Sequence, residues 1–119
     1  MWQKLECVAI YTHDLDKSVE FYNSMGLAKE WEAVPDEAEP WRLIGMTFPG
    51  GASQLVLKNN PDRTFSETEV VVHDVRKVHE SLAANEDVRW ILAPTVNSLG
   101  GHVAVLQAPD GNTFVLVGP

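Results

Sequence analysis

Two histidine–aspartate pairs, sixty residues apart, are the first residues of this chain that suggest chemistry. His13-Asp14 is followed by Leu15-Asp16-Lys17, and His73-Asp74 is followed by Val75-Arg76-Lys77. Imidazole and carboxylate groups can bind metal ions and transfer protons. Each pair, however, follows an apolar run and opens a helical pattern, so each aspartate is expected to cap a helix. The repeated motif therefore indicates a duplicated structural unit more than a catalytic pair.

The elements around the two motifs recur in the same order. A strand precedes each capped helix, and three further strands follow it, so each copy is βαβββ. The polar tract 59–63 breaks any regular element near the middle of the chain, where a connection is expected. The expected helices run from Asp14 to Gly26 and from Asp74 to Asn85, and the expected strands are 5–12, 28–33, 41–48, 54–58, 67–72, 88–93, 103–107 and 113–117.

Composition narrows the range of partners. The 119 residues, 45% of them hydrophobic, suit one domain with a packed core. Nine basic and seventeen acidic residues give a net charge of −8, which argues against nucleic acid and anionic membranes. A single cysteine, with no export signal or membrane-spanning run in the sequence, favours the cytoplasm. The glycine pairs at 50–51 and 100–101 lack the Lys-Ser/Thr of a phosphate-binding loop.

Several segments together resemble a known superfamily. They are Val8-Ala9-Ile10-Tyr11, the run from Asp14 to Tyr22 with Gly26-Leu27, and Ala108-Pro109-Asp110-Gly111-Asn112. They are similar to the opening and closing segments of the glyoxalase, bleomycin-resistance and extradiol-dioxygenase superfamily, also called vicinal oxygen chelate proteins. The resemblance implies an α+β fold in which two βαβββ modules, about 1–60 and about 65–119 of one domain, form a curved mixed-sheet groove with helices outside.

The resemblance also implies where a metal would bind. Members that use a metal place four ligands in the groove, commonly His or Gln on the first strands and Glu on the last strands of the modules. The matching positions here are Cys7, Val56, Glu67 and Val115. Valine has no lone pair to donate, and divalent metals normally take three or four protein ligands. We therefore expect no metal cofactor. The alternative is a degenerate site for Zn, Ni, Mn or Fe built from Cys7, Glu67 and His102 or a residue of a partner chain.

Counting by twos along the expected strands gives the side chains that would face the groove. Trp31, Trp41 and Trp90 fall in expected strands, where a tryptophan more often packs than binds, although aromatic walls suit planar ligands. Arg42, which could meet an anion, and His102, at the start of a strand, are further candidates, although solvation explains each of them as well. Glu67 and Glu69 could form an acidic patch or a base, or a solvated strand edge. The predicted groove consists of Cys7, Ala9, Tyr11, Trp41, Arg42, Gln54, Val56, Glu67, Glu69, Val71, Trp90, His102 and Val115.

These observations favour a metal-independent protein that binds a small molecule, similar to the bleomycin-resistance members that sequester drugs, and expected to be a cytoplasmic homodimer. A groove with apolar walls and a few polar groups is typical of small-molecule sites. One alternative is a glyoxalase-like lyase, isomerase or dioxygenase that retains a degenerate metal site. Another is a sensory or protein-interaction module.

Overall fold

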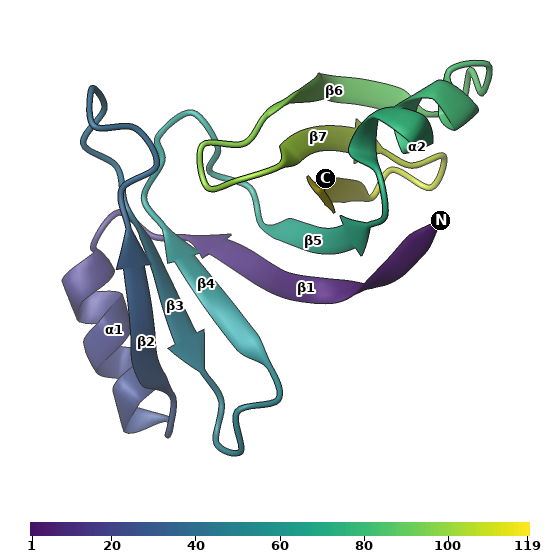
Figure 1. The fold of residues 1–119 in the computed structure, drawn as a ribbon. Coiled ribbons are helices and arrows are strands. Elements are labelled where there is room, and N and C mark those ends of the chain that lie inside the picture. Colours follow the sequence, from purple (N-terminus) through teal and green to yellow (C-terminus); the bar gives the residue numbers. More distant parts are fainter. The chain divides into compact units, whose positions relative to one another are not determined.

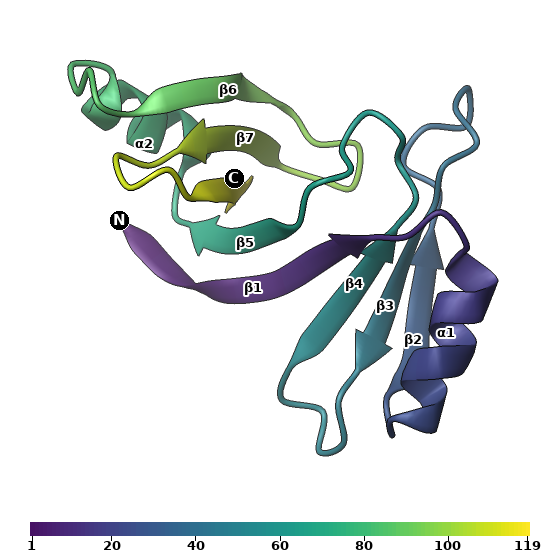
Figure 2. The same cartoon turned by 180° about the vertical axis from the view of Figure 1, so that it is seen from behind.

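The computed structural model describes residues 1–119 and contains two compact units. The α1 unit is Cys7–Ser66, and the α2 unit is Met1–Glu6 with Glu67–Pro119, so the strand β1 (Trp2–Tyr11) contributes to both. Both halves have the predicted order βαβββ (Figures 1 and 2). The remaining elements are α1 (Leu15–Ser24), β2 (Ala28–Ala33), β3 (Leu43–Thr47), β4 (Gln54–Lys58), β5 (Glu67–Val72), α2 (Val75–Leu82), β6 (Arg89–Val96), β7 (His102–Gln107) and β8 (Thr113–Gly118).

In the α1 unit, the strand order is β2-β3-β4-β1. β1 and β4 are parallel and their register pairs Ala9 with Val56, whereas β4, β3 and β2 are antiparallel. The helix α1 lies against one face of this sheet (Figure 1). The core under α1 consists of buried side chains from the helix, the following turn and alternate strand positions, namely Leu15, Leu27, Ile44, Met46 and Leu57.

In the α2 unit, the strand order is β5-β8-β7-β6, with β5 and β8 parallel and the other neighbours antiparallel. The first residues of β1 belong to this unit, where the ring of Trp2 lies 5.0 Å from that of Phe114. The helix α2 packs against one face of this sheet, and the side chains between them form a core. That core consists of Val70, Val72, Val75, Val78, Ala104, Leu106 and Leu116.

Because side chains alternate along a strand, the opposite face of each sheet carries the intervening residues and no helix. In the α1 unit this helix-free face includes Cys7, Ala9, Gln54 and Val56, since their neighbours Ile10, Leu55 and Leu57 pack under α1. In the α2 unit the helix-free face includes Glu67, Glu69, Val71, Val105 and Val115, since Val70, Val72, Ala104, Leu106 and Leu116 pack with α2.

Both predicted helix caps are confirmed. The carboxylate of Asp14 accepts a hydrogen bond of 3.1 Å from the backbone amide of Lys17, and Asp74 accepts an equivalent bond of 3.1 Å from Lys77. Each bond satisfies one of the amides that the first helical turn leaves without a partner. The duplicated aspartates therefore start equivalent helices.

The cap at Asp74 makes the stability of the protein pH-dependent. The backbone hydrogen bond from Lys77 holds the pKa of Asp74 below its usual 3.8. A depressed carboxyl pKa stabilises the folded state above the unfolded-state pKa, and this stabilisation is lost as the pH falls through the folded-state pKa. Asparagine also caps helices but does not titrate. We expect wild type to exceed Asp74→Asn in free energy of unfolding at pH 7, and this difference to vanish as the pH falls well below 3.8.

Urea unfolding at a series of pH values measures this difference, with Asp87→Asn as the control for removing one exposed carboxylate. A gap between wild type and Asp74→Asn that does not change with pH would contradict the assigned cap.

Five strands differ from their predicted bounds, and the differences are largest in β1 and β6. β1 begins at Trp2 instead of residue 5, and β6 continues to Val96, through Pro94, where the sequence suggested a break. β6 is an edge strand with two register shifts, and a proline that cannot donate to a ladder is tolerated at such an edge. Neither helix is long and apolar enough to cross a bilayer.

Candidate functional site

The helix-free face of the α1 unit has an apolar floor. Cys7, Ala9 and Val56 form a buried cluster with 6%, 1% and 4% of their surfaces exposed, and Trp31 and Leu43 pack against it. Ala9 and Val56 are direct neighbours across the β1–β4 ladder. Cys7 is buried in this cluster, which contains no histidine. The floor therefore offers mainly apolar contact, together with one thiol.

Trp31 forms a wall over this floor because the facing residue on β3 is glycine. Trp31 pairs with Gly45, and a Cβ atom at Gly45 would lie 2.1 Å from Nε1 of the indole. The ring thus occupies the space that any other side chain at position 45 would fill. Nε1 donates a 3.2 Å hydrogen bond to Oε1 of Gln54, which fixes the orientation of both groups.

A bulge in β2 adds a carboxylate beside this indole. The register passes from Lys29 opposite Met46 to Trp31 opposite Gly45, so Glu30 is the extra residue. A regular strand would direct Glu30 and Trp31 to opposite faces, but a bulge can redirect a side chain. Nε2 of Gln54 donates a 3.2 Å bond to Oε2 of Glu30, and the hydroxyl of Thr47 donates to the same oxygen. Glu30, Gln54 and Trp31 therefore form one network on the helix-free face.

The far end of the same face carries Tyr11 and Lys58. The two residues are neighbours in the parallel ladder, so their side chains leave the sheet on one side. Lys58 is 1% exposed, and its Nζ lies 4.9 Å from the centre of the Phe65 ring. The stem and ammonium group of this lysine are thus part of the packed structure.

In the α2 unit, the helix-free face brings together four of the predicted groove residues. Glu67 and Val115 are buried, at 7% and 4% exposure, and Glu69 lies directly beside Val115 in the parallel β5–β8 ladder. Val71 follows on the same face and is half-buried. This face therefore combines two carboxylates with apolar side chains, as predicted from the alternation.

Three other predicted groove residues lie on helix-covered faces, which corrects their predicted placement. Arg42 lies 3.3 Å from Glu32 and 3.8 Å from Asp16 at the start of α1. Trp90 packs against the α2 core, with its ring 4.6 Å from that of His79 on the helix. His102 lies two and four residues before Ala104 and Leu106 of that core along β7, so its side chain leaves the same face of the sheet. Trp41 precedes β3 and is half-buried.

The four positions that would hold a divalent metal do not fit one. Val56 and Val115 offer only methyl groups, which leaves the thiol of Cys7 in the α1 unit and the carboxylate of Glu67 in the α2 unit. Two donors are fewer than the three or four that such ions take from proteins. No group of three or more His, Cys, Asp or Glu side chains in the structure is arranged to hold a metal ion.

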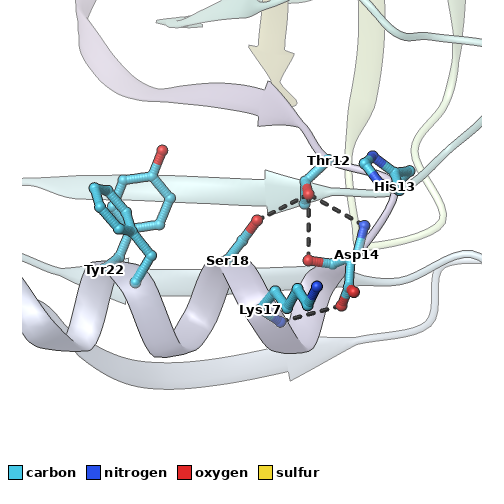
Figure 3. Close-up of a pocket in the computed structure, with 7 residues that line it drawn as sticks. Thr12, His13, Asp14, Lys17, Ser18 and Tyr22 are labelled. Carbon is cyan, nitrogen blue, oxygen red and sulfur yellow. Dashed lines mark hydrogen bonds between the residues drawn. The ribbon is translucent and has the colours of Figure 1, made fainter.

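A hollow of about 350 Å³ at the start of α1 includes the first histidine–aspartate pair (Figure 3). Its polar groups bond to one another: Oγ1 of Thr12 accepts 2.8 Å and 3.2 Å hydrogen bonds from the hydroxyl of Ser18 and the amide of Asp14. His13 is exposed at its rim. These hydrogen bonds hold the start of α1, where Asp14 caps the helix.

Sequence reasoning missed Glu30 and left Trp31 outside the predicted groove. Glu30 was missed because alternation was not counted along 28–33, and its place beside Trp31 depends on a bulge in the pairing with β3. For Trp31, a signal was present: it shares a face with Gly45, and a glycine inside a strand often marks a close approach.

Comparison with known proteins agrees with this architecture. The chain matches the Glyoxalase/Bleomycin resistance protein/Dioxygenase superfamily over residues 4–116. No curated protein sequence matches it. Among solved structures, a methylmalonyl-CoA epimerase from Mycobacterium tuberculosis has a TM-score of 0.73 at 20% identity, covering 97% of this chain and 87% of that chain. A methylmalonyl-CoA epimerase in complex with methylmalonyl-CoA and NH4+ has a TM-score of 0.72 at 25% identity, covering 99% of this chain and 95% of that chain.

A superfamily member from Vibrio splendidus 12B01 has a TM-score of 0.67 at 19% identity, covering 98% of this chain and all of that chain. Similarity at these identities supports the glyoxalase-like α+β fold. The family match spans nearly the whole chain, and the chain therefore belongs to the Glyoxalase/Bleomycin resistance protein/Dioxygenase superfamily.

Proposed function

We propose that this protein binds a small organic molecule on the helix-free face of the α1 unit, and that it does so without a divalent metal. The observation that carries the proposal is the combination of an apolar floor at Cys7, Ala9 and Val56 with the polar network of Trp31 and Gln54. Small-molecule sites generally pair apolar walls with a few fixed polar groups. Such a face can hold a ligand by burial of apolar surface and orient it through hydrogen bonds.

The absence of a metal from this proposal follows from the side chains. At the two family positions on the α1 unit, Cys7 belongs to the apolar cluster and Val56 has no donor atom. Binding therefore depends on packing and hydrogen bonds, and removal of metal ions should leave it unchanged.

A second candidate function is isomerisation of a carboxylic thioester. It is favoured by the epimerase structure in complex with methylmalonyl-CoA, which is 25% identical and matches 99% of this chain. An epimerase that removes and returns a proton needs an acid–base group within reach of the reacting carbon. Among the acid–base groups on the helix-free face of the α1 unit, we assign that role to the carboxylate of Glu30, which is fixed by its hydrogen bond from Gln54.

Thermal unfolding with a panel of small organic molecules tests the main proposal, because a ligand that binds only the folded state raises the melting temperature. We expect at least one class of compound to raise it equally with EDTA and with added Zn²⁺, Ni²⁺, Mn²⁺ or Fe²⁺. Stabilisation that appears only with metal would contradict the proposal.

The isomerase is tested separately by incubating the protein with methylmalonyl-CoA in D₂O and following deuterium incorporation by NMR. Exchange that needs added metal would favour the metal-dependent alternative, and exchange in EDTA that is lost in Glu30→Gln would favour the acid–base role. The homodimer and the cytoplasmic location remain predictions, and light scattering after size exclusion measures the first.

A further inference from the structure

We propose that Trp31, Gln54 and Glu30 form a subsite for a small planar organic cation, such as a protonated amidine attached to an aromatic ring. The inference rests on the proposed function, because it names the class of molecule that the helix-free face of the α1 unit binds. It is carried by a carboxylate that the β2 bulge places next to an indole, and by the charge of the groups around that carboxylate.

The partners of Glu30 are neutral. Its Oε2 accepts hydrogen bonds from the amide of Gln54 and the hydroxyl of Thr47, neither of which carries a positive charge. The adjacent cation, Lys29, is 3.1 Å from Glu32 instead. A carboxylate fixed by neutral donors keeps its negative charge available to a ligand. Any N–H donor gains from bonding to an ionised carboxylate, and a cationic donor also gains the attraction between opposite charges, so a cationic N–H donor is the preferred ligand group.

The second element of the subsite is the indole of Trp31. The ring is held over Gly45 by its hydrogen bond to Gln54, and it is half-buried, so it is ordered without a ligand. Tryptophan faces attract cations and stack on flat apolar groups, with the cation within about 6 Å of the ring centre. A flat cationic ligand can therefore contact the ring while its N–H groups reach Glu30.

Gln54 connects the two elements. Its carbonyl oxygen accepts from Trp31 at 3.2 Å and its amide nitrogen donates to Glu30 at 3.2 Å, so both side chains are positioned before a ligand arrives. Pre-positioned groups lose less conformational entropy on binding. The same carboxylate repels anions, and the net charge of −8 adds to this discrimination. The expected order of affinity is cation, then neutral molecule, then anion.

Three probes of nearly the same shape test this order. Benzamidine is a cation, benzamide is neutral and benzoate is an anion. In calorimetric titrations at low salt we expect benzamidine to bind at least about tenfold more tightly than benzamide, and benzoate to bind weakest. Benzamidine should also shift the NMR signal of the Trp31 indole N–H, identified as the one that Trp31→Phe removes.

Glu30→Gln keeps the size of the side chain and removes its charge. We expect it to weaken benzamidine binding by about tenfold or more and to weaken benzamide binding much less. Glu37→Gln is the matched control, because it makes the same charge change at an exposed residue of the loop before β3. Trp31→Phe keeps an aromatic face, so it should weaken benzamidine binding less than Glu30→Gln does.

The proposal is overturned if benzamidine does not bind, if benzamidine and benzamide bind equally, or if Glu37→Gln weakens binding as much as Glu30→Gln. The wild-type comparison does not depend on how well any variant folds. Should other members of the compound panel stabilise the protein while benzamidine does not, the small-molecule function stands and this subsite is wrong. If no compound stabilises the protein, both fail.

Discussion

Replacing Leu57 or Leu116 by alanine is expected to lower the free energy of unfolding by about 3 kcal/mol in each case. The two leucines lie on the last strands of their modules, each facing its own helix, and both are 0% exposed. Truncation removes apolar contacts and leaves a cavity that a close-packed core fills only in part. Since the free energy of unfolding of a small domain is about 5–15 kcal/mol, each loss is a large share of the stability of the protein.

Urea denaturation measures both changes, and Leu5→Ala is the matched control, because Leu5 is 59% exposed. An exposed substitution of this kind is expected to cost no more than about 0.5 kcal/mol. If Leu116→Ala lowered the free energy of unfolding by less than about 1 kcal/mol while Leu57→Ala lowered it by about 3 kcal/mol, β4 and β8 would not have equal roles in their cores.

The fold was largely predictable because its signals are local. An aspartate before an apolar helical stripe specifies a cap wherever it occurs, and both Asp14 and Asp74 have that role in the structure. Element order follows from the change between strand and helix periodicity. The predicted bounds are wrong where contacts between residues far apart in the sequence determine where a strand begins or ends. β1 starts early at Trp2, whose ring contacts Phe114, and β6 passes Pro94 because an edge strand allows it.

The site was predicted less completely, for two reasons. Where alternation was counted, the residues share a face as expected: Cys7, Ala9 and Val56 form one cluster. Trp90 and His102 were chosen by side-chain type, and both lie on the face of the sheet that packs against α2 instead of the helix-free face. Counting back by twos from Leu106 would have placed His102 correctly.

Glu30 illustrates the second reason. Its orientation depends on a register shift between β2 and β3, which alternation within one strand does not encode. Of the three groups in the proposed cation subsite, Gln54 follows the regular alternation and was predicted, whereas the approach of Glu30 to Trp31 depends on the bulge and was not.

Gly45→Val is expected to have opposite effects with and without Trp31. In the wild-type protein, a Cβ at position 45 would lie 2.1 Å from Nε1 of the indole, so the ring must leave the sheet and lose its contacts with the Cys7 cluster and its bond to Gln54. Overpacking of this kind costs about 2 kcal/mol.

In the Trp31→Ala background the steric conflict is absent, and valine is better suited to a strand than glycine. We therefore expect Gly45→Val to be neutral or stabilising there, with a coupling of about 2 kcal/mol between positions 31 and 45 in a double-mutant cycle measured by urea denaturation. Additive effects would show that Trp31 does not lie over Gly45. In that case the indole is also not held beside Glu30, so this one cycle tests the geometry on which the proposed ligand face depends.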